Sequence, residues 1–257
     1  MPLEPIVLLV PSSAAARELP RRLASVSGAV AAVYPVKLVK PFQLEGTGHG
    51  DLARAVAEPA LLSAGLRPWQ RGHDTLLAAR LLEQPHGLAV DAGLSPTRMA
   101  EALARTLSAL RTAGITPEQM EALPSRAAAT SEDAERLRAV AALYRRFHDE
   151  VDGRVADLAT VLREAARRLD EARWLDGAEV LIVDDLELTP LEWDLLEALA
   201  RRFRVRLLER VRPPALVASS FAQRAAERGV GPVRWEESPL RLLAPPAPAS
   251  GASTSCG

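Results

Sequence analysis

Two short, strongly apolar runs constrain the fold of this chain more than any other feature. Ile6–Val10 is rich in β-branched residues and is followed by Pro11, and Val180–Val183 is followed by two acidic residues. Continuous apolar runs of this length are typical of strands buried on both faces of a parallel sheet. Between the runs, apolar residues recur at helical spacing from about residue 73 to residue 173. The pattern predicts an α/β protein with a parallel sheet and a large all-helical insertion.

We place the boundaries where the pattern changes. Residues 1–45 and 178–235 are expected to form the α/β core, and residues 46–177 the helical insertion. Residues 236–257 are dominated by Pro, Ala, Ser and Gly, which predicts a linker or tail.

Further elements follow from local signals. The segments Val30–Tyr34 and Arg204–Glu209 are expected to be strands. Helix starts are expected at Pro96, after Thr130, and at Pro190, where Thr189 and Glu192 resemble a capping box.

Composition excludes several classes of protein. The 32 basic and 33 acidic residues nearly cancel, so a general polyanion binder is excluded and any nucleic-acid contact must use a local patch. The paired arginines along the helices are read as solvated faces, although they could follow phosphates if they converge in space. The single cysteine, Cys256, excludes a disulfide within the chain and a cysteine-rich metal site. We expect a cytoplasmic protein without membrane contact, because no apolar run is long enough for a signal peptide or a transmembrane helix.

The acidic pair Asp184 and Asp185 is the strongest candidate for chemistry. A carboxylate that follows a buried parallel strand reaches the carboxyl edge of the sheet, where P-loop NTPases hold Mg²⁺. Asp184 is therefore a weak Mg²⁺ candidate, and the alternative is that both acids simply end the strand and solvate a loop. No other metal site is expected, because His49, His73, His86 and His148 show no ligand spacing.

The phosphate-binding loop that should accompany such acids is missing. After the first strand, at Pro11, Ser12 and Ser13, the chain has neither the glycines nor the lysine of that loop. The only lysines are Lys37 and Lys40, so a Gly-Lys pair and a (D/E)xK nuclease motif are both absent. We therefore expect no catalytic residues in this chain.

The order of these features resembles a known family. The matching stretches are Val10-Pro11-Ser12, Val33-Tyr34-Pro35, Leu143 to Phe147, Asp157-Leu158 and, most specifically, Val180 to Glu192. Together they resemble the N-terminal region of the AddB-type subunit of bacterial ATP-dependent helicase–nucleases, which belong to the PD-(D/E)XK nuclease family. That region is similar to a superfamily 1 helicase domain (domain 1A) whose P-loop has degenerated.

The resemblance carries several expectations. It implies a P-loop-NTPase-like core in which Asp184 and Asp185 match the Walker-B-like acids and Pro11, Ser12 and Ser13 occupy the degenerate P-loop position. It implies a DNA-repair role in double-strand-break end processing, with DNA ends or single strands and a helicase–nuclease partner subunit as partners. The Mg²⁺, ATP and iron–sulfur cluster of the family are expected to belong to the full-length protein or its partner, not to this chain.

Three functions remain open at this point. The first is a non-catalytic helicase-like scaffold that forms part of a longer repair nuclease, of which this chain would be a fragment. The second is a divergent Mg²⁺-dependent NTPase that uses Asp184 and Asp185. The third is a free-standing protein-interaction adaptor. The missing Gly-Lys pair favours the first over the second.

Overall fold

The computed structural model describes most of the chain in eight segments. These are residues 6–10, 33–36, 51–70, 72–88, 95–127, 130–182, 186–208 and 220–234, together with the isolated residues Ala14, Glu18 and Arg21. The chain divides into two compact units. Unit 1 comprises residues 1–37, 173–187 and 199–257, and unit 2 comprises residues 38–172 and 188–198.

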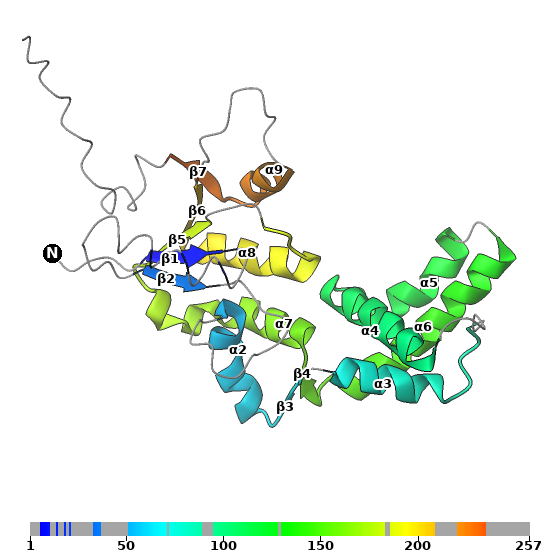
Figure 1. Cartoon of the computed structure of the whole chain (residues 1–257). Helices are drawn as coiled ribbons and strands as arrows, with labels where there is room; N and C mark the ends of the chain where they lie inside the picture. The colour runs from blue at the N-terminus through cyan, green and yellow to red at the C-terminus, as the bar shows by residue number, and fades with distance from the viewer. Residues whose placement is uncertain are drawn as a thin grey trace, which may run out of the picture. The chain divides into compact units, whose positions relative to one another are not determined.

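Unit 1 contains a five-stranded parallel sheet (Figure 1). Its strands lie in the order β2-β1-β5-β6-β7. They are β1 (Ile6–Leu9), β2 (Val33–Val36), β5 (Glu179–Ile182), β6 (Arg204–Leu208) and β7 (Gly231–Val233). The two apolar runs singled out in the sequence are therefore neighbours in one sheet, which confirms the predicted α/β class with a parallel sheet.

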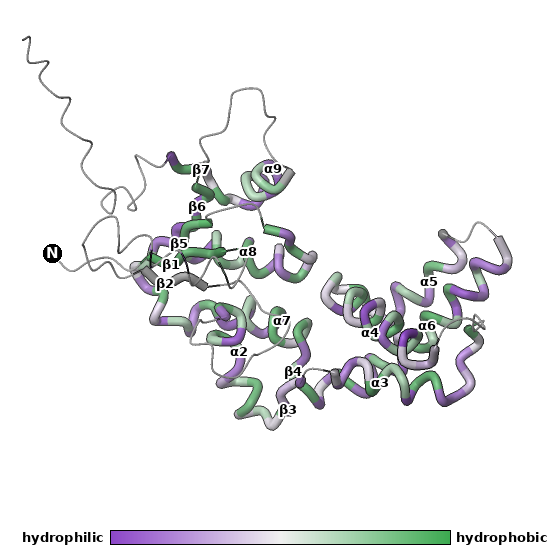
Figure 2. Tube along the Cα trace, viewed as in Figure 1, coloured by the Kyte–Doolittle hydropathy of each residue, from purple (hydrophilic) through white to green (hydrophobic). Residues whose placement is uncertain are grey.

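The central strands of the sheet are almost inaccessible to solvent. All four residues of β1 are buried, and Val180, Leu181 and Ile182 of β5 are completely so. Figure 2 colours β1 as hydrophobic along its length, whereas purple and green alternate along the helices of the chain. This contrast has a physical cause, because a central parallel strand is covered on both faces and cannot place polar side chains in water.

One strand differs from its prediction. The second strand is Val33–Val36, which extends past the predicted end at Tyr34 and contains Pro35, whereas residues 30–32 lie outside the described residues. A proline lacks the backbone N–H that a ladder uses, but β2 is an edge strand and tolerates it. Helix α9 (Ser220–Glu227) and strand β7 were not predicted, because neither carries a long periodic signal.

Unit 2 consists mainly of helices. They are α2 (Leu52–Ser63), α3 (His73–Leu82), α4 (Pro96–Thr112), α5 (Pro117–Ala127), α6 (Ser131–Val151) and α7 (Leu158–Arg168). Helix α2 packs on α7, α3 on α4, and α5 on α6. Two short 3₁₀ turns, Leu169–Glu171 and Arg173–Leu175, follow α7, and α8 (Pro190–Arg202) follows β5.

The insertion is not entirely helical, which corrects the prediction. Strands β3 (Arg67–Pro68) and β4 (Val155–Ala156) form a two-stranded parallel pair. Each strand has two residues, so neither produces an alternating pattern that sequence analysis could detect.

The predicted helix starts are confirmed. Ser95 caps α4 and Pro96 occupies its first turn. Thr130 caps α6, where its Oγ1 accepts from the backbone N–H of Asp133 at 3.0 Å. At α8 the carboxylate of Glu192 accepts from the backbone N–H of Thr189 at 2.7 Å. These side chains satisfy N–H groups that have no partner inside the helix.

The core of unit 2 lies among α3, α4, α5 and α6. Its largest members are Leu107, Leu143, Tyr144 and Phe147, all essentially inaccessible to water. They repeat at three- and four-residue spacing, so one face of each helix is apolar. In the described segments, no helix combines the length and the apolar character needed to cross a membrane.

Candidate functional site

The carboxyl edge of the sheet is the first candidate site. Strands β1 and β5 pair in parallel and in register, with Leu9 opposite Ile182. The chain passes from β1 to β2 on one side of the sheet, and β5, β6 and β7 lie on the other side. The strand order therefore reverses between β1 and β5. In open α/β sheets this switch point, at the carboxyl ends of the strands, is where ligands bind.

The predicted site residues follow these two strands directly in sequence. Pro11, Ser12 and Ser13 come after β1, and Asp184 and Asp185 come after β5, but all five lie outside the described residues. The structure thus brings together the strands that precede them. Their own geometry, and the proposed Mg²⁺ role of Asp184, stay predictions.

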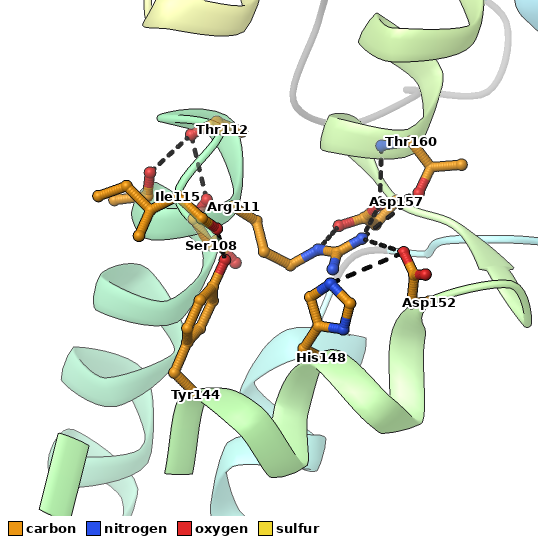
Figure 3. Close-up of polar contacts among 10 residues, drawn as sticks. Ser108, Arg111, Thr112, Ile115, Tyr144, His148, Asp152, Asp157 and Thr160 are labelled. Atoms are coloured by element: carbon orange, nitrogen blue, oxygen red, sulfur yellow. Dashed lines mark hydrogen bonds and ion pairs between the residues drawn. The ribbon is translucent and has the colours of Figure 1, made fainter. Parts of the chain in front are cut away.

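A second candidate lies in unit 2, around the buried cation Arg111 at the end of α4. Its side chain is 1% exposed. As Figure 3 shows, Arg111 Nε donates to Asp157 Oδ2 at 2.7 Å and Arg111 Nη2 donates to Asp157 Oδ1 at 3.2 Å. Asp152 Oδ1 lies 3.6 Å from Nη2 and is on a half-exposed side chain. A buried guanidinium is tolerated only with such partners, because removing a charge from water costs several kcal/mol.

Asp157 both caps helix α7 and pairs with Arg111. As the residue that caps α7, its Oδ1 accepts from the backbone N–H of Thr160 at 2.9 Å and from the Thr160 hydroxyl at 2.6 Å. Within the described part of the chain, its Oδ2 accepts one hydrogen bond, from Arg111 Nε. A carboxylate oxygen can accept two donors, so Oδ2 retains capacity for one more.

The ion pair sets the protonation states at this point. Burial by itself raises the pKa of Asp157, but the hydrogen bonds and positive charge of Arg111 outweigh it and hold that pKa below its ordinary value. Burial likewise lowers the pKa of Arg111, and the hydrogen bond and charge of Asp157 reverse this and raise it. Both groups therefore stay charged at neutral pH.

Two aromatic side chains of α6 border the ion pair. Tyr144 is inaccessible to water and its hydroxyl donates to the Ile115 carbonyl at 2.6 Å. Burial raises the pKa of this phenol, so it remains a donor. His148 Nε2 lies 4.0 Å from Asp152 Oδ1, the oxygen that also faces Arg111 (Figure 3). Among the described residues, Arg111 Nη1 is buried without a hydrogen-bond partner.

A cavity of about 150 Å³ adjoins this cluster. It is lined by Asp157 and Phe147, and by Trp69 and Asp74 from the segment around the start of α3. The Trp69 and Phe147 rings meet edge to face, with centroids 6.4 Å apart. Sequence analysis missed both the ion pair and the cavity, because Arg111 and Asp157 are 46 positions apart and no local pattern links them.

Residues that could hold a metal do not gather in the described part of the chain. No group of three or more His, Cys, Asp or Glu side chains there could bind one. An iron–sulfur cluster does not fit the chain either, because such clusters need several cysteine ligands and Cys256 is the single cysteine.

Part of the chain matches a known family model. Residues 93–206 match the family model described as ADDB, N-terminal, which covers somewhat less than half of the chain. The matched segment runs from just before α4 into β6, so it includes Arg111, Asp157 and β5. It supports the resemblance to an AddB-type N-terminal region over those residues, and it does not reach β1. None of the curated proteins matches the chain.

Proposed function

We propose that this chain is the helicase-like N-terminal region of a DNA-repair nuclease subunit of AddB type. In this role it is a non-catalytic scaffold that binds DNA or a partner subunit during the processing of double-strand-break ends. The observation that carries the proposal is the family match over residues 93–206. Such work places the protein in the cytoplasm, where bacterial DNA lies.

The sheet supports the helicase-like part of the proposal. A P-loop-like core needs a phosphate-loop strand and an acidic strand in one parallel sheet, and β1 and β5 are neighbours there. The residues directly after β1, from Val10 to Arg17, include neither glycine nor lysine, and the chain has no Gly-Lys pair. A degenerate P-loop explains both facts, since the fold is kept while the groups that cradle phosphate are lost.

Nucleotide binding separates the scaffold from the alternative NTPase. We expect Mg·ATP to leave the thermal unfolding midpoint of the chain unchanged, because a ligand stabilises only a folded state that binds it. Protection by Mg·ATP that Asp184→Ala abolishes, and that Asp149→Ala on the exposed face of α6 preserves, would contradict the scaffold and establish the NTPase.

Assembly tests the partner and DNA half of the proposal. We expect the chain to co-purify with an AddA-type helicase–nuclease subunit, and the assembly to bind a labelled DNA duplex end with an affinity that falls as salt rises. A closed circular duplex of equal length is the control for end recognition. If neither the subunit nor DNA at low salt is bound, the proposal fails and the free-standing adaptor takes its place.

A further inference from the structure

We infer that the cavity beside α3 binds an arginine side chain of a partner polypeptide. Two features define the cavity. Trp69 and Phe147 supply aromatic walls, and Asp74 and Asp157 are the charged side chains that line it among the described residues. All residues that line the cavity belong to unit 2, whereas the strands of the candidate site at the sheet edge belong to unit 1. The inference about the cavity therefore does not depend on the proposed function.

Among the described residues, no cation balances the charge of Asp74 in the cavity. Asp157 is neutralised by Arg111, but Asp74 has no cation within ion-pair distance among the described residues. Its Oδ1 accepts one hydrogen bond, from the backbone N–H of Thr75 at 2.9 Å. Asp74 sits in the first turn of α3, where the helix favours a negative charge. A half-buried carboxylate that no described residue pairs with is complementary to a cation.

The aromatic side chains of Trp69 and Phe147 favour a guanidinium over other cations. Tryptophan is the best aromatic partner for a positive charge, and a guanidinium both stacks on such rings and bonds to carboxylates through its fork of N–H groups. Two acceptors are available for that fork: the carboxylate of Asp74 and the spare capacity of Asp157 Oδ2. A phosphate would be repelled by the carboxylate of Asp74, which no described cation neutralises.

The size of the cavity also favours a single side chain as the ligand. At about 150 Å³ it is smaller than the roughly 300–1,000 Å³ of pockets that enclose drug-sized ligands. It therefore suits the end of one side chain and not a whole nucleotide. A hydrophobic side chain of similar size would leave Asp74 desolvated and unpaired, which costs free energy.

The test uses the full chain and two small probes. N-acetyl-arginine methylamide carries the guanidinium, and N-acetyl-citrulline methylamide is its neutral counterpart of nearly equal shape. The indole N–H signals of the four tryptophans are followed by NMR, and Trp69→Phe identifies the signal of Trp69 by its loss. We expect the arginine probe to shift this signal saturably, and the citrulline probe to bind at least tenfold more weakly.

Two isosteric variants test whether the charge of Asp74 is needed for binding the arginine probe. Asp74→Asn retains the acceptor for Thr75 but loses the charge, and we expect it to weaken the arginine probe at least tenfold. Asp149→Asn, on the exposed face of α6, is the matched control and should bind as the unmodified chain does. Unchanged circular dichroism and thermal midpoint of Asp74→Asn show that the fold is retained.

Three outcomes with the arginine and citrulline probes would overturn the inference. They are no saturable shift of the Trp69 signal, equal binding of both probes, and an unchanged affinity in Asp74→Asn. A fourth outcome uses a short single-stranded oligonucleotide. If it shifts the Trp69 signal and the shift is lost in Asp74→Asn, the cavity binds nucleic acid and the inference is overturned as well. Because the probes contain neither DNA nor the AddA-type subunit, none of the three outcomes bears on the scaffold proposal.

Discussion

At the scale of single residues, the buried ion pair between Arg111 and Asp157 is the main polar contact described in unit 2 between α4 and α7. It joins the end of α4 to the start of α7 with two hydrogen bonds between buried charges. Such a pair adds little net stability over a well-packed apolar pair, but it makes the loss of one partner costly, because the other is left charged and dry.

Removing the carboxylate should therefore destabilise the protein strongly. We expect Asp157→Ala to lower the free energy of unfolding by about 3–5 kcal/mol, measured by urea titration followed by circular dichroism. Asp152→Ala is the control: it removes a half-exposed partner 3.6 Å from Arg111, and such pairs contribute less than about 1 kcal/mol. Equal losses in the two variants would contradict the role assigned to Asp157.

The same pair predicts a dependence on pH. The folded-state pKa of Asp157 is lowered below its ordinary value of 3.8. A depressed carboxyl pKa stabilises the fold above the unfolded pKa, and that contribution is lost as pH falls through the folded pKa. We expect the urea midpoint to fall below about pH 4 and to fall less in Asp157→Asn. Parallel pH profiles for the two proteins would show that another group is responsible.

At the scale of elements, the turn after α4 positions the backbone carbonyl that binds Tyr144 beside the Arg111–Asp157 pair. Gly114 has φ +74°, a left-handed conformation, and its N–H donates to the Arg111 carbonyl at 3.0 Å. The turn places Ile115, whose carbonyl accepts from the hydroxyl of Tyr144. A glycine after a helix was an available sequence signal, but the partner of the carbonyl that follows it was not.

Replacing this glycine should cost more than replacing another glycine of the same kind. In Gly114→Ala a Cβ would lie 3.3 Å from Leu191 Cδ2, in addition to the strained φ. We expect a loss of about 1–3 kcal/mol in thermal or urea unfolding. Gly65→Ala is the control, with φ +79° and no atom within 4 Å of the new Cβ. A loss in Gly114→Ala no larger than in Gly65→Ala would exclude a packing role for the contact with Leu191.

At the scale of the whole molecule, strand order sets the order of stability within the sheet. Strands β1 and β5 are paired on both sides, whereas β7 is an edge strand. Backbone amides exchange with solvent through opening reactions, and central strands open least. We expect hydrogen exchange, followed by mass spectrometry, to be slowest in Ile6–Leu9 and Glu179–Ile182 and markedly faster in Gly231–Val233. Equal protection of β7 would mean that a further segment covers that edge.

The sequence alone was enough to predict the elements whose signal is local. The apolar run of β5 and the capping residues at Ser95, Thr130 and Glu192 are patterns within a few residues, produced by burial on both faces and by unpaired N–H groups. From them follow the α/β class, the parallel sheet and most helix starts. The family match over residues 93–206 covers β5 and these three capping residues.

Only the tertiary structure decided what lies beside what. It made β1 and β5 neighbours in register, paired Arg111 with Asp157, and brought Asp74 and Trp69 to one cavity. No short-range rule relates these residues, because a contact between distant positions is set by how helices and strands pack and not by their own propensities. The periodicity of α4 and α7 predicts two amphipathic helices, but the burial of a charge between them appears only when the chain has folded.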